Sequence, residues 1–230
     1  MCNIGLLIAI SLLALTAIGA GSMQLRKAFR HSPKLPEEFA LAVAWVFAVA
    51  SLVWLTAYLC GFTILGFGSP WSWLAAAHFF FAGFGALTVT ALCCRCVSHP
   101  LALRVLRTLL FIHPLAYLIT AGGIMGYPYC DEMGASLYQA LFISQLACFL
   151  LGDPSRLPRG PKFLLVFALI VPTCTMVPAL FWAWRTPILD LFQMVRYHGI
   201  VNAVGHIGLA FGAFAWGRPS SHATPSNSPS

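Results

Sequence analysis

Charged side chains are scarce in this 230-residue chain. Asp, Glu, Lys and Arg together make up 8% of it, and only 6 of them are acidic. A soluble domain carries roughly a quarter charged residues, whereas this chain is 60% hydrophobic and has a mean hydropathy of +0.84. Because too few polar groups remain to coat a surface that faces water, an ordinary soluble domain is excluded.

The motifs of several common enzyme classes are absent as well. There is no Gly-rich phosphate loop, no G-x-S-x-G nucleophile elbow and no H-E-x-x-H zinc pair. The formal charge of +7 does not indicate nucleic acid, because the basic residues fall in short segments between apolar runs and form no continuous patch. We therefore expect neither a cofactor nor a nucleic-acid partner.

What the chain does contain is a series of apolar runs of the length that crosses a bilayer, about 20 residues. Backbone groups in hydrocarbon must be satisfied within the segment, so these runs form helices. The sequence predicts an all-α integral membrane protein, a seven-transmembrane-helix bundle in residues 1–218, with a disordered Ser/Pro-rich tail at 219–230. The expected spans are residues 3–23, 39–61, 71–94, 103–127, 133–151, 162–184 and 194–216.

Basic residues alternate between the two sides that seven spans define. No positive side chain precedes the first run, so we interpret it as a retained span and not as a signal peptide. The positive-inside rule then predicts a multi-pass protein of the cell membrane with its N-terminus outside and its C-terminus in the cytoplasm. The residues expected inside are Arg26, Lys27, Arg30, Lys34, Arg95, Arg104, Arg107, Arg156, Arg159, Lys162 and Arg218.

The last span contains the densest set of polar side chains. His198, Asn202 and His206 are spaced i, i+4 and i+8, which places them on one stripe of a helix. Polar groups inside a membrane are costly, so this stripe should face the bundle interior. A seam that joins helices and a functional site are equally consistent with it.

In the third span, His78 is expected at the same depth as His198, in the outer third of the membrane. Two histidines at matched depth are typical of side chains that line one cavity, and they form our leading site hypothesis. His113, which precedes Pro114 in the fourth span, is interpreted as structural.

The cysteines divide between the two sides of the membrane. Cys60 and Cys130 fall at outer ends of spans, where an oxidising compartment permits a disulfide between them. Cys93, Cys94 and Cys96 lie at an inner edge and resemble a palmitoylation site as much as a metal site. No second Cys/His cluster completes a zinc shell, so no metal site is predicted.

Two polar segments resemble those of the YndJ-like membrane proteins of bacteria. They are His78-Phe79 leading into Ala82-Gly83-Phe84, and Arg196-Tyr197-His198-Gly199 leading into Asn202 and Gly205. The resemblance covers the membrane region, most of the chain. It implies that His78, Arg196, His198 and Asn202 belong to one site, and it implies no particular reaction.

The residues favour a membrane-embedded, cofactor-free enzyme that acts on an apolar small molecule. Imidazoles suit proton transfer, so we expect isomerase, cyclase or epoxide-opening chemistry on an isoprenoid or polyketide. His78 and His198 would be the acid and base, Asn202 would orient the substrate and Arg196 would hold an oxygen anion. His206, Tyr197 and Asp190 would complete the substrate site.

Two other functions are compatible with the same residues. A small-molecule transporter or channel is the first alternative, because polar residues along one helix can line a path. A b-type haem protein, with His78 and His198 as axial ligands, is the second.

Overall fold

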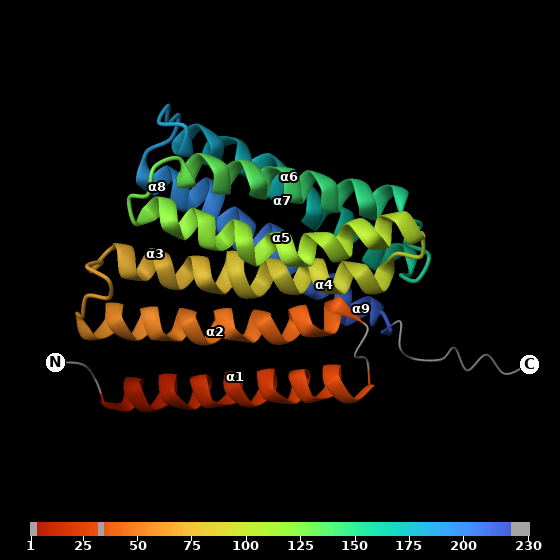
Figure 1. Ribbon diagram of the computed structural model, residues 1–230, viewed down its shortest axis with the longest axis horizontal. Helices are drawn as coiled ribbons and strands as arrows, with labels where there is room; N and C mark the ends of the chain where they lie inside the picture. The colour runs from red at the N-terminus through yellow and green to blue at the C-terminus, as the bar shows by residue number, and fades with distance from the viewer. Residues whose placement is uncertain (1–3, 32–34, 222–230) are drawn as a thin grey trace, which may run out of the picture. The chain divides into compact units, whose positions relative to one another are not determined.

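The computed structural model describes residues 4–31 and 35–221 of the chain, and these are almost entirely helical. Seven helices are long and apolar enough to cross a membrane, which confirms the predicted all-α fold with seven spans. The third and seventh spans are each built of several segments. The elements are α1 (Ile4–His31), α2 (Pro36–Cys60), α3 (Trp71–His78), η1 (Phe79–Gly85), α4 (Ala86–Cys96), α5 (Pro100–Ile124), α6 (Cys130–Leu151), α7 (Arg159–Ala183), α8 (Leu191–Met194), η2 (Val195–Ile200), η3 (Asn202–Gly208) and α9 (Leu209–Gly217) (Figure 1).

Most of the helices begin about one turn before the predicted spans. Pro36 and Pro100 each stand in the first turn of their helix, where the missing N–H would have no helical partner in any case. The first helix also continues past the predicted end at residue 23, through its basic residues to His31. Long basic side chains allow this, since their stems lie along apolar surface while their charged ends reach water.

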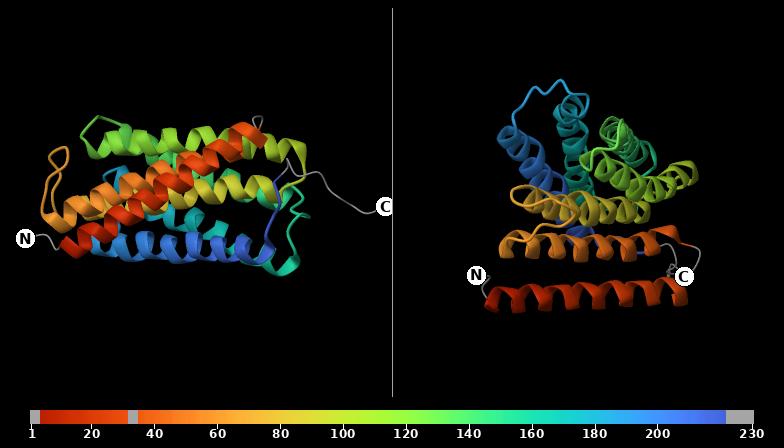
Figure 2. Two further views of the ribbon diagram at one scale, coloured as in Figure 1. Left: turned by 90° about the horizontal axis from the view of Figure 1, so that it is seen from below. Right: turned by 60° about the vertical axis from the view of Figure 1, so that its left-hand side comes forward.

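The chain divides into two compact units, Met1–Thr88 and Val89–Ser230. The single membrane domain expected in residues 1–218 stays a prediction. In the first unit, α1 packs along α2, and α2 packs along α3 and η1. In the second unit, α5 packs on α6, α6 on α7, and α7 on η3 and α9, so that α7 lies between α6 and the seventh span (Figure 2). Beyond residue 221, the predicted tail lies outside the described residues.

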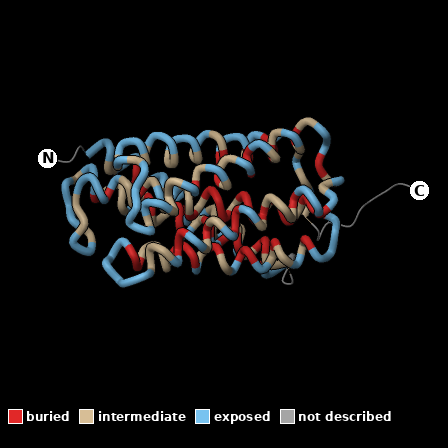
Figure 3. The backbone as a smooth tube through the Cα atoms, turned by 90° about the horizontal axis from the view of Figure 1, so that it is seen from above, coloured by how far each residue is buried: buried red, intermediate tan, exposed pale blue. Residues whose placement is uncertain are grey.

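The first span is exposed along most of its length (Figure 3). Large apolar side chains such as Ile4, Leu12 and Leu15 are more than half exposed, and its buried positions are Ile10, Ala17 and Ala28. In water this surface would be strongly unfavourable. It therefore fits a helix whose outer face lies against lipid chains.

Wide helical turns of the π type occur in the two spans that carry the predicted site histidines. The segment η1 follows His78 directly, η2 contains His198, and η3 contains Asn202 and His206. In these turns the backbone N–H of residue i+5 donates a hydrogen bond to the carbonyl oxygen of residue i. This arrangement is rare and is often found at functional sites. Nothing in the residue pattern predicted these turns.

The contact between α5 and α6 depends on a glycine. A Cβ placed on Gly134 would collide with the side chain and the backbone of Thr120 on the neighbouring helix. Small residues permit such close approach of membrane helices, because packing, not water exclusion, holds them together.

We predict that Gly134→Ala lowers the free energy of unfolding in detergent by about 1–3 kcal/mol, the usual cost of overpacking. Gly19→Ala is the matched control, because a Cβ on Gly19 meets nothing within 4 Å. Thermal unfolding of both purified variants checks the prediction. Equal midpoints for the two variants would show that the close approach is unimportant.

Candidate functional site

The sixth span, α7, offers backbone carbonyl groups as hydrogen-bond acceptors to its neighbours. It contains Pro172 and Pro178 within the helix. A proline has no N–H, so the carbonyl four residues earlier loses its helical partner. For Pro172 that carbonyl belongs to Ala168, and for Pro178 it belongs to Cys174. Unpaired carbonyls inside a membrane must find other donors.

His206 supplies the donor for Ala168. Its Nδ1 lies 2.8 Å from the Ala168 carbonyl oxygen, and its side chain is 2% exposed. A carbonyl oxygen only accepts hydrogen bonds, so Nδ1 must carry the hydrogen. In a neutral imidazole this makes Nε2 the acceptor nitrogen. The Nε2 atom is buried and has no hydrogen-bond partner among the described residues.

His198 makes the equivalent contact about two turns away on the seventh span. Its Nδ1 lies 2.9 Å from the carbonyl oxygen of Thr175, next to the carbonyl that Pro178 leaves without a helical partner. The amide nitrogen of Asn202 is 3.4 Å from the same Nδ1. The shorter contact decides the protonation: Nδ1 is the donor, and a second donor cannot bond to it. Asn202 is better placed with its amide oxygen turned towards His198, an orientation that shape alone does not distinguish.

The predicted polar stripe is therefore a seam between the seventh span and α7. In this seam Asn202 lies beside His198, and both His198 and His206 bond to carbonyl groups of α7. Both histidines have the same tautomer, with the hydrogen on Nδ1 and the lone pair on Nε2. The hydrogen bonds that join the two spans thus use Nδ1 of each ring.

Next to this seam, the interior of the second unit contains a cluster of His206, Phe142, Tyr138 and His113, whose arrangement the sequence did not predict. The His206 ring packs edge-on against Phe142, Phe142 stacks on Tyr138, and Tyr138 packs edge-on against His113. Further along α6, the amide of Gln145 donates to the Cys93 sulfur at 3.6 Å. His113 and Gln145 are fully buried. The signal for these residues was their polarity within an apolar run, since each such group needs a partner.

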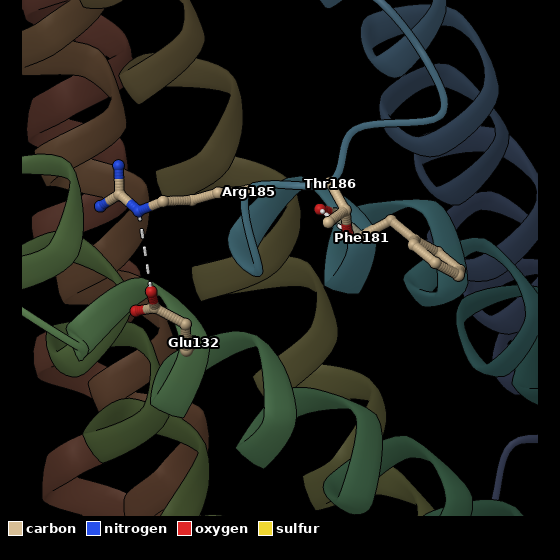
Figure 4. Close-up of polar contacts among 4 residues, drawn as sticks. All are labelled: Glu132, Phe181, Arg185 and Thr186. Carbon is tan, nitrogen blue, oxygen red and sulfur yellow. Dashed lines mark hydrogen bonds and ion pairs between the residues drawn. The ribbon is translucent and has the colours of Figure 1, made fainter.

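A groove of about 400 Å³ opens at the end of this unit where α7 stops. It is lined by Ser136, Leu180, Phe181, Trp184 and Thr186. Beside it, Arg185 extends towards Glu132 with 3.9 Å between Nε and Oε1, and the Thr186 hydroxyl donates to the Phe181 carbonyl (Figure 4). Because Arg185 is 80% exposed, this ion pair contributes little to stability. The aromatic lining suits an apolar ligand.

Three other predicted site residues lie at the start of the seventh span and differ in their surroundings. Asp190 caps α8: it accepts from the Gln193 backbone at 2.8 Å, and the Asp190 backbone N–H donates to the amide oxygen of the Gln193 side chain at 2.9 Å. Arg196 and Tyr197 are exposed and contact each other, with 5.5 Å from the guanidinium carbon to the ring centre. The structure thus gives Asp190 a local structural contact and leaves Arg196 at the surface.

His78 belongs to the first unit, whereas the other predicted site residues belong to the second. Its Nδ1 lies 3.3 Å from the carbonyl oxygen of Leu74 in its own helix, and its side chain is exposed. The juxtaposition of His78 with His198 stays a prediction.

The disulfide that the sequence permits between Cys60 and Cys130 is not formed. Cys130 is a free thiol, while Cys60 is disulfide-bonded; Cys2 lies outside the described residues. Location on the same side of the membrane permits a disulfide but does not establish one, because a disulfide also requires Cα atoms within about 7 Å. Cys93, Cys94 and Cys96 are all buried, which removes them as a palmitoylation site. Among the described residues, no group of three or more metal-binding side chains occurs.

The sequence model of one protein family, described as "YndJ-like protein", matches residues 3–206. This region contains the first six spans and the whole polar stripe of the seventh. No curated protein matches the chain, and no solved structure does.

We predict an energetic coupling between His206 and Pro172. In Pro172→Ala the new N–H pairs with the Ala168 carbonyl, so His206→Phe should then destabilise the protein less than it does beside the proline. Unfolding free energies of the two single variants and the double variant should give a coupling of about 1 kcal/mol.

The matched control is the same cycle with Pro178→Ala, because Pro178 leaves a different carbonyl, that of Cys174, without its helical partner. There the effects of the two substitutions should add. Additivity in both cycles would mean that the proline does not create the acceptor that His206 uses.

Proposed function

Because the chain belongs to the YndJ-like family, whose matched region includes both histidines of the seventh span, we propose a membrane-embedded enzyme in which His198 performs acid–base chemistry on an apolar small molecule. The observation that carries the proposal is the 2.9 Å contact between His198 Nδ1 and the Thr175 carbonyl. It fixes the ring and gives Nε2 the lone pair of a general base. An oriented, neutral imidazole is the usual form of such a base.

His198 is better suited to this role than His206 because a substrate must reach the base. The His198 side chain is half-buried, whereas His206 is 2% exposed. Asn202, within 3.4 Å of His198, acts as a positioning residue. Because water is scarce within the membrane, a polar group of the substrate keeps its hydrogen bonds to His198 and Asn202.

We propose the groove at the end of α7 as the substrate site. Leu180 in its lining lies five residues beyond Thr175, about 7.5 Å along the helix and on a different face of it, so a bound molecule would have to extend along α7 to reach His198. The lining is mostly apolar and aromatic, and Ser136 and Thr186 add hydroxyl groups. This composition favours an isoprenoid- or polyketide-like molecule that enters from lipid over a charged metabolite.

Transport is the second candidate, and the two prolines of α7 are the observation that favours it. Interrupted helices with side chains that bond to their carbonyls are common at transporter sites. The π-type turns of the seventh span add a second irregular helix beside the first. Enzyme and transporter differ in one measurable respect, because only the enzyme changes its substrate chemically.

His198→Gln separates chemistry from helix joining. Glutamine can still donate to the Thr175 carbonyl, but it has no basic nitrogen. We expect cells with the wild-type chain to convert a lipid-soluble compound, and the variant to convert it roughly 10²–10⁴-fold more slowly. Mass spectrometry of whole-culture extracts, compared with cells lacking the protein, measures the conversion.

His99→Gln is the matched control, because His99 lies exposed in a loop and should leave conversion unchanged. Full conversion by His198→Gln would assign His198 to helix joining. A compound that moves between cells and medium without chemical change would instead establish transport.

We further propose that the N-terminus lies outside the cell membrane and the C-terminus in the cytoplasm. The disulfide at Cys60 supports this, since Cys60 ends α2 on the side predicted to be outside, and disulfides persist in oxidising compartments.

A membrane-impermeant maleimide on intact cells should therefore label Cys60 only after reduction. Cys130, a free thiol, should be labelled without reduction once the protein is denatured. Mass spectrometry of the two peptides reads the result. Labelling of Cys60 in unreduced cells would contradict the disulfide. Labelling of Cys60 only from the cytoplasmic side would contradict the orientation.

A further inference from the structure

We infer that His206, Tyr138 and Gln145 bind ordered water inside the second unit, at a site separate from the proposed substrate groove. Each of these side chains has a buried polar atom without a hydrogen-bond partner among the described residues: His206 Nε2, the Tyr138 hydroxyl and Gln145 Oε1. Their exposed fractions are 2%, 6% and 0%.

The three side chains face the same part of the interior. Tyr138, Phe142 and Gln145 are spaced i, i+4 and i+7 on α6, so they share one face of that helix. His206 approaches this face from the seventh span, with 5.5 Å between its ring centre and that of Phe142. Phe142 stacks on Tyr138 at 5.8 Å. The Phe142 ring is therefore in contact with both His206 and Tyr138.

The chemistry of the three atoms determines what can occupy the site. His206 Nε2 must accept, because the Ala168 carbonyl takes the hydrogen on Nδ1. Gln145 Oε1 is an acceptor too, since the amide hydrogens point to Cys93. The Tyr138 hydroxyl both donates and accepts. An occupant must therefore be able to donate to two acceptors, and water does so without bringing a charge into the core.

The alternative is a dry core with three unsatisfied polar atoms. Each would cost roughly 1–3 kcal/mol, and buried polar groups in folded proteins are generally paired with protein or water. A buried water usually makes about three hydrogen bonds, so ordered water beside Phe142 can pair with these atoms, whereas no rotation of the Tyr138 hydroxyl alone satisfies all three.

X-ray hydroxyl-radical footprinting of the full chain in lipid nanodiscs tests this inference, because radiolysis of bound water oxidises side chains that touch it even when bulk solvent does not reach them. We expect oxidation of Phe142, which is 6% exposed. Phe214, 7% exposed and in α9 of the same unit, is the matched control and should remain unmodified. Equal oxidation rates for Phe142 and Phe214 would overturn the proposal.

Two variants locate the water. His206→Phe and Gln145→Leu each remove one acceptor, and each should abolish the excess oxidation of Phe142 while Phe214 stays unchanged. If His206→Phe does not fold, the Gln145→Leu variant and the comparison of Phe142 with Phe214 in the wild-type protein still test the inference. Persistent oxidation of Phe142 in a folded variant would show that the missing acceptor is not a water ligand. The readout requires no activity, so its failure leaves the role of His198 open.

Discussion

The hydrogen bond from His206 to the Ala168 carbonyl is the interaction on which the arrangement of the second unit depends. Pro172 removes the helical partner of that carbonyl, and the bilayer offers none to replace it. The seventh span must therefore present a donor at this depth, and His206 is that donor. Once this bond has fixed the rotation of η3, the adjoining turns place His198 beside Thr175.

The hydrogen bonds of His206 to Ala168 and of His198 to Thr175 determine the tautomers of the two imidazoles. A histidine that donates from Nδ1 to a backbone carbonyl has a defined tautomer and a defined ring plane. The resulting Nε2 differs in its surroundings at the two positions: at His206 it is enclosed by α6, and at His198 the side chain is half-buried. The two histidines thus contact the same helix through the same ring nitrogen, but in surroundings that differ in burial.

The seven spans and the polar stripe could be predicted from the sequence because both follow from local rules. Apolar length defines a span, and a spacing of four residues places His198, Asn202 and His206 on one face. The partners of that stripe could not be predicted, because hydrogen bonds across helices depend on which spans are neighbours. The π-type turns were missed for a related reason, since they have no composition of their own. Whether Cys60 and Cys130 pair could not be decided from the sequence, because location on the same side of the membrane does not imply proximity.

The prolines of α7 show how a non-local contact can nevertheless be read from local chemistry. Pro172 identifies Ala168, by its position four residues earlier, as a carbonyl that needs an external donor. Donors inside the spans are few, because only 8% of the chain is charged and most span residues are aliphatic or aromatic. Matching each freed carbonyl with the in-span histidines and glutamines at similar depth leaves a small number of possible pairs. In this chain the pair at that depth is His206 with Ala168, so proline positions constrain helix neighbours where hydropathy alone does not.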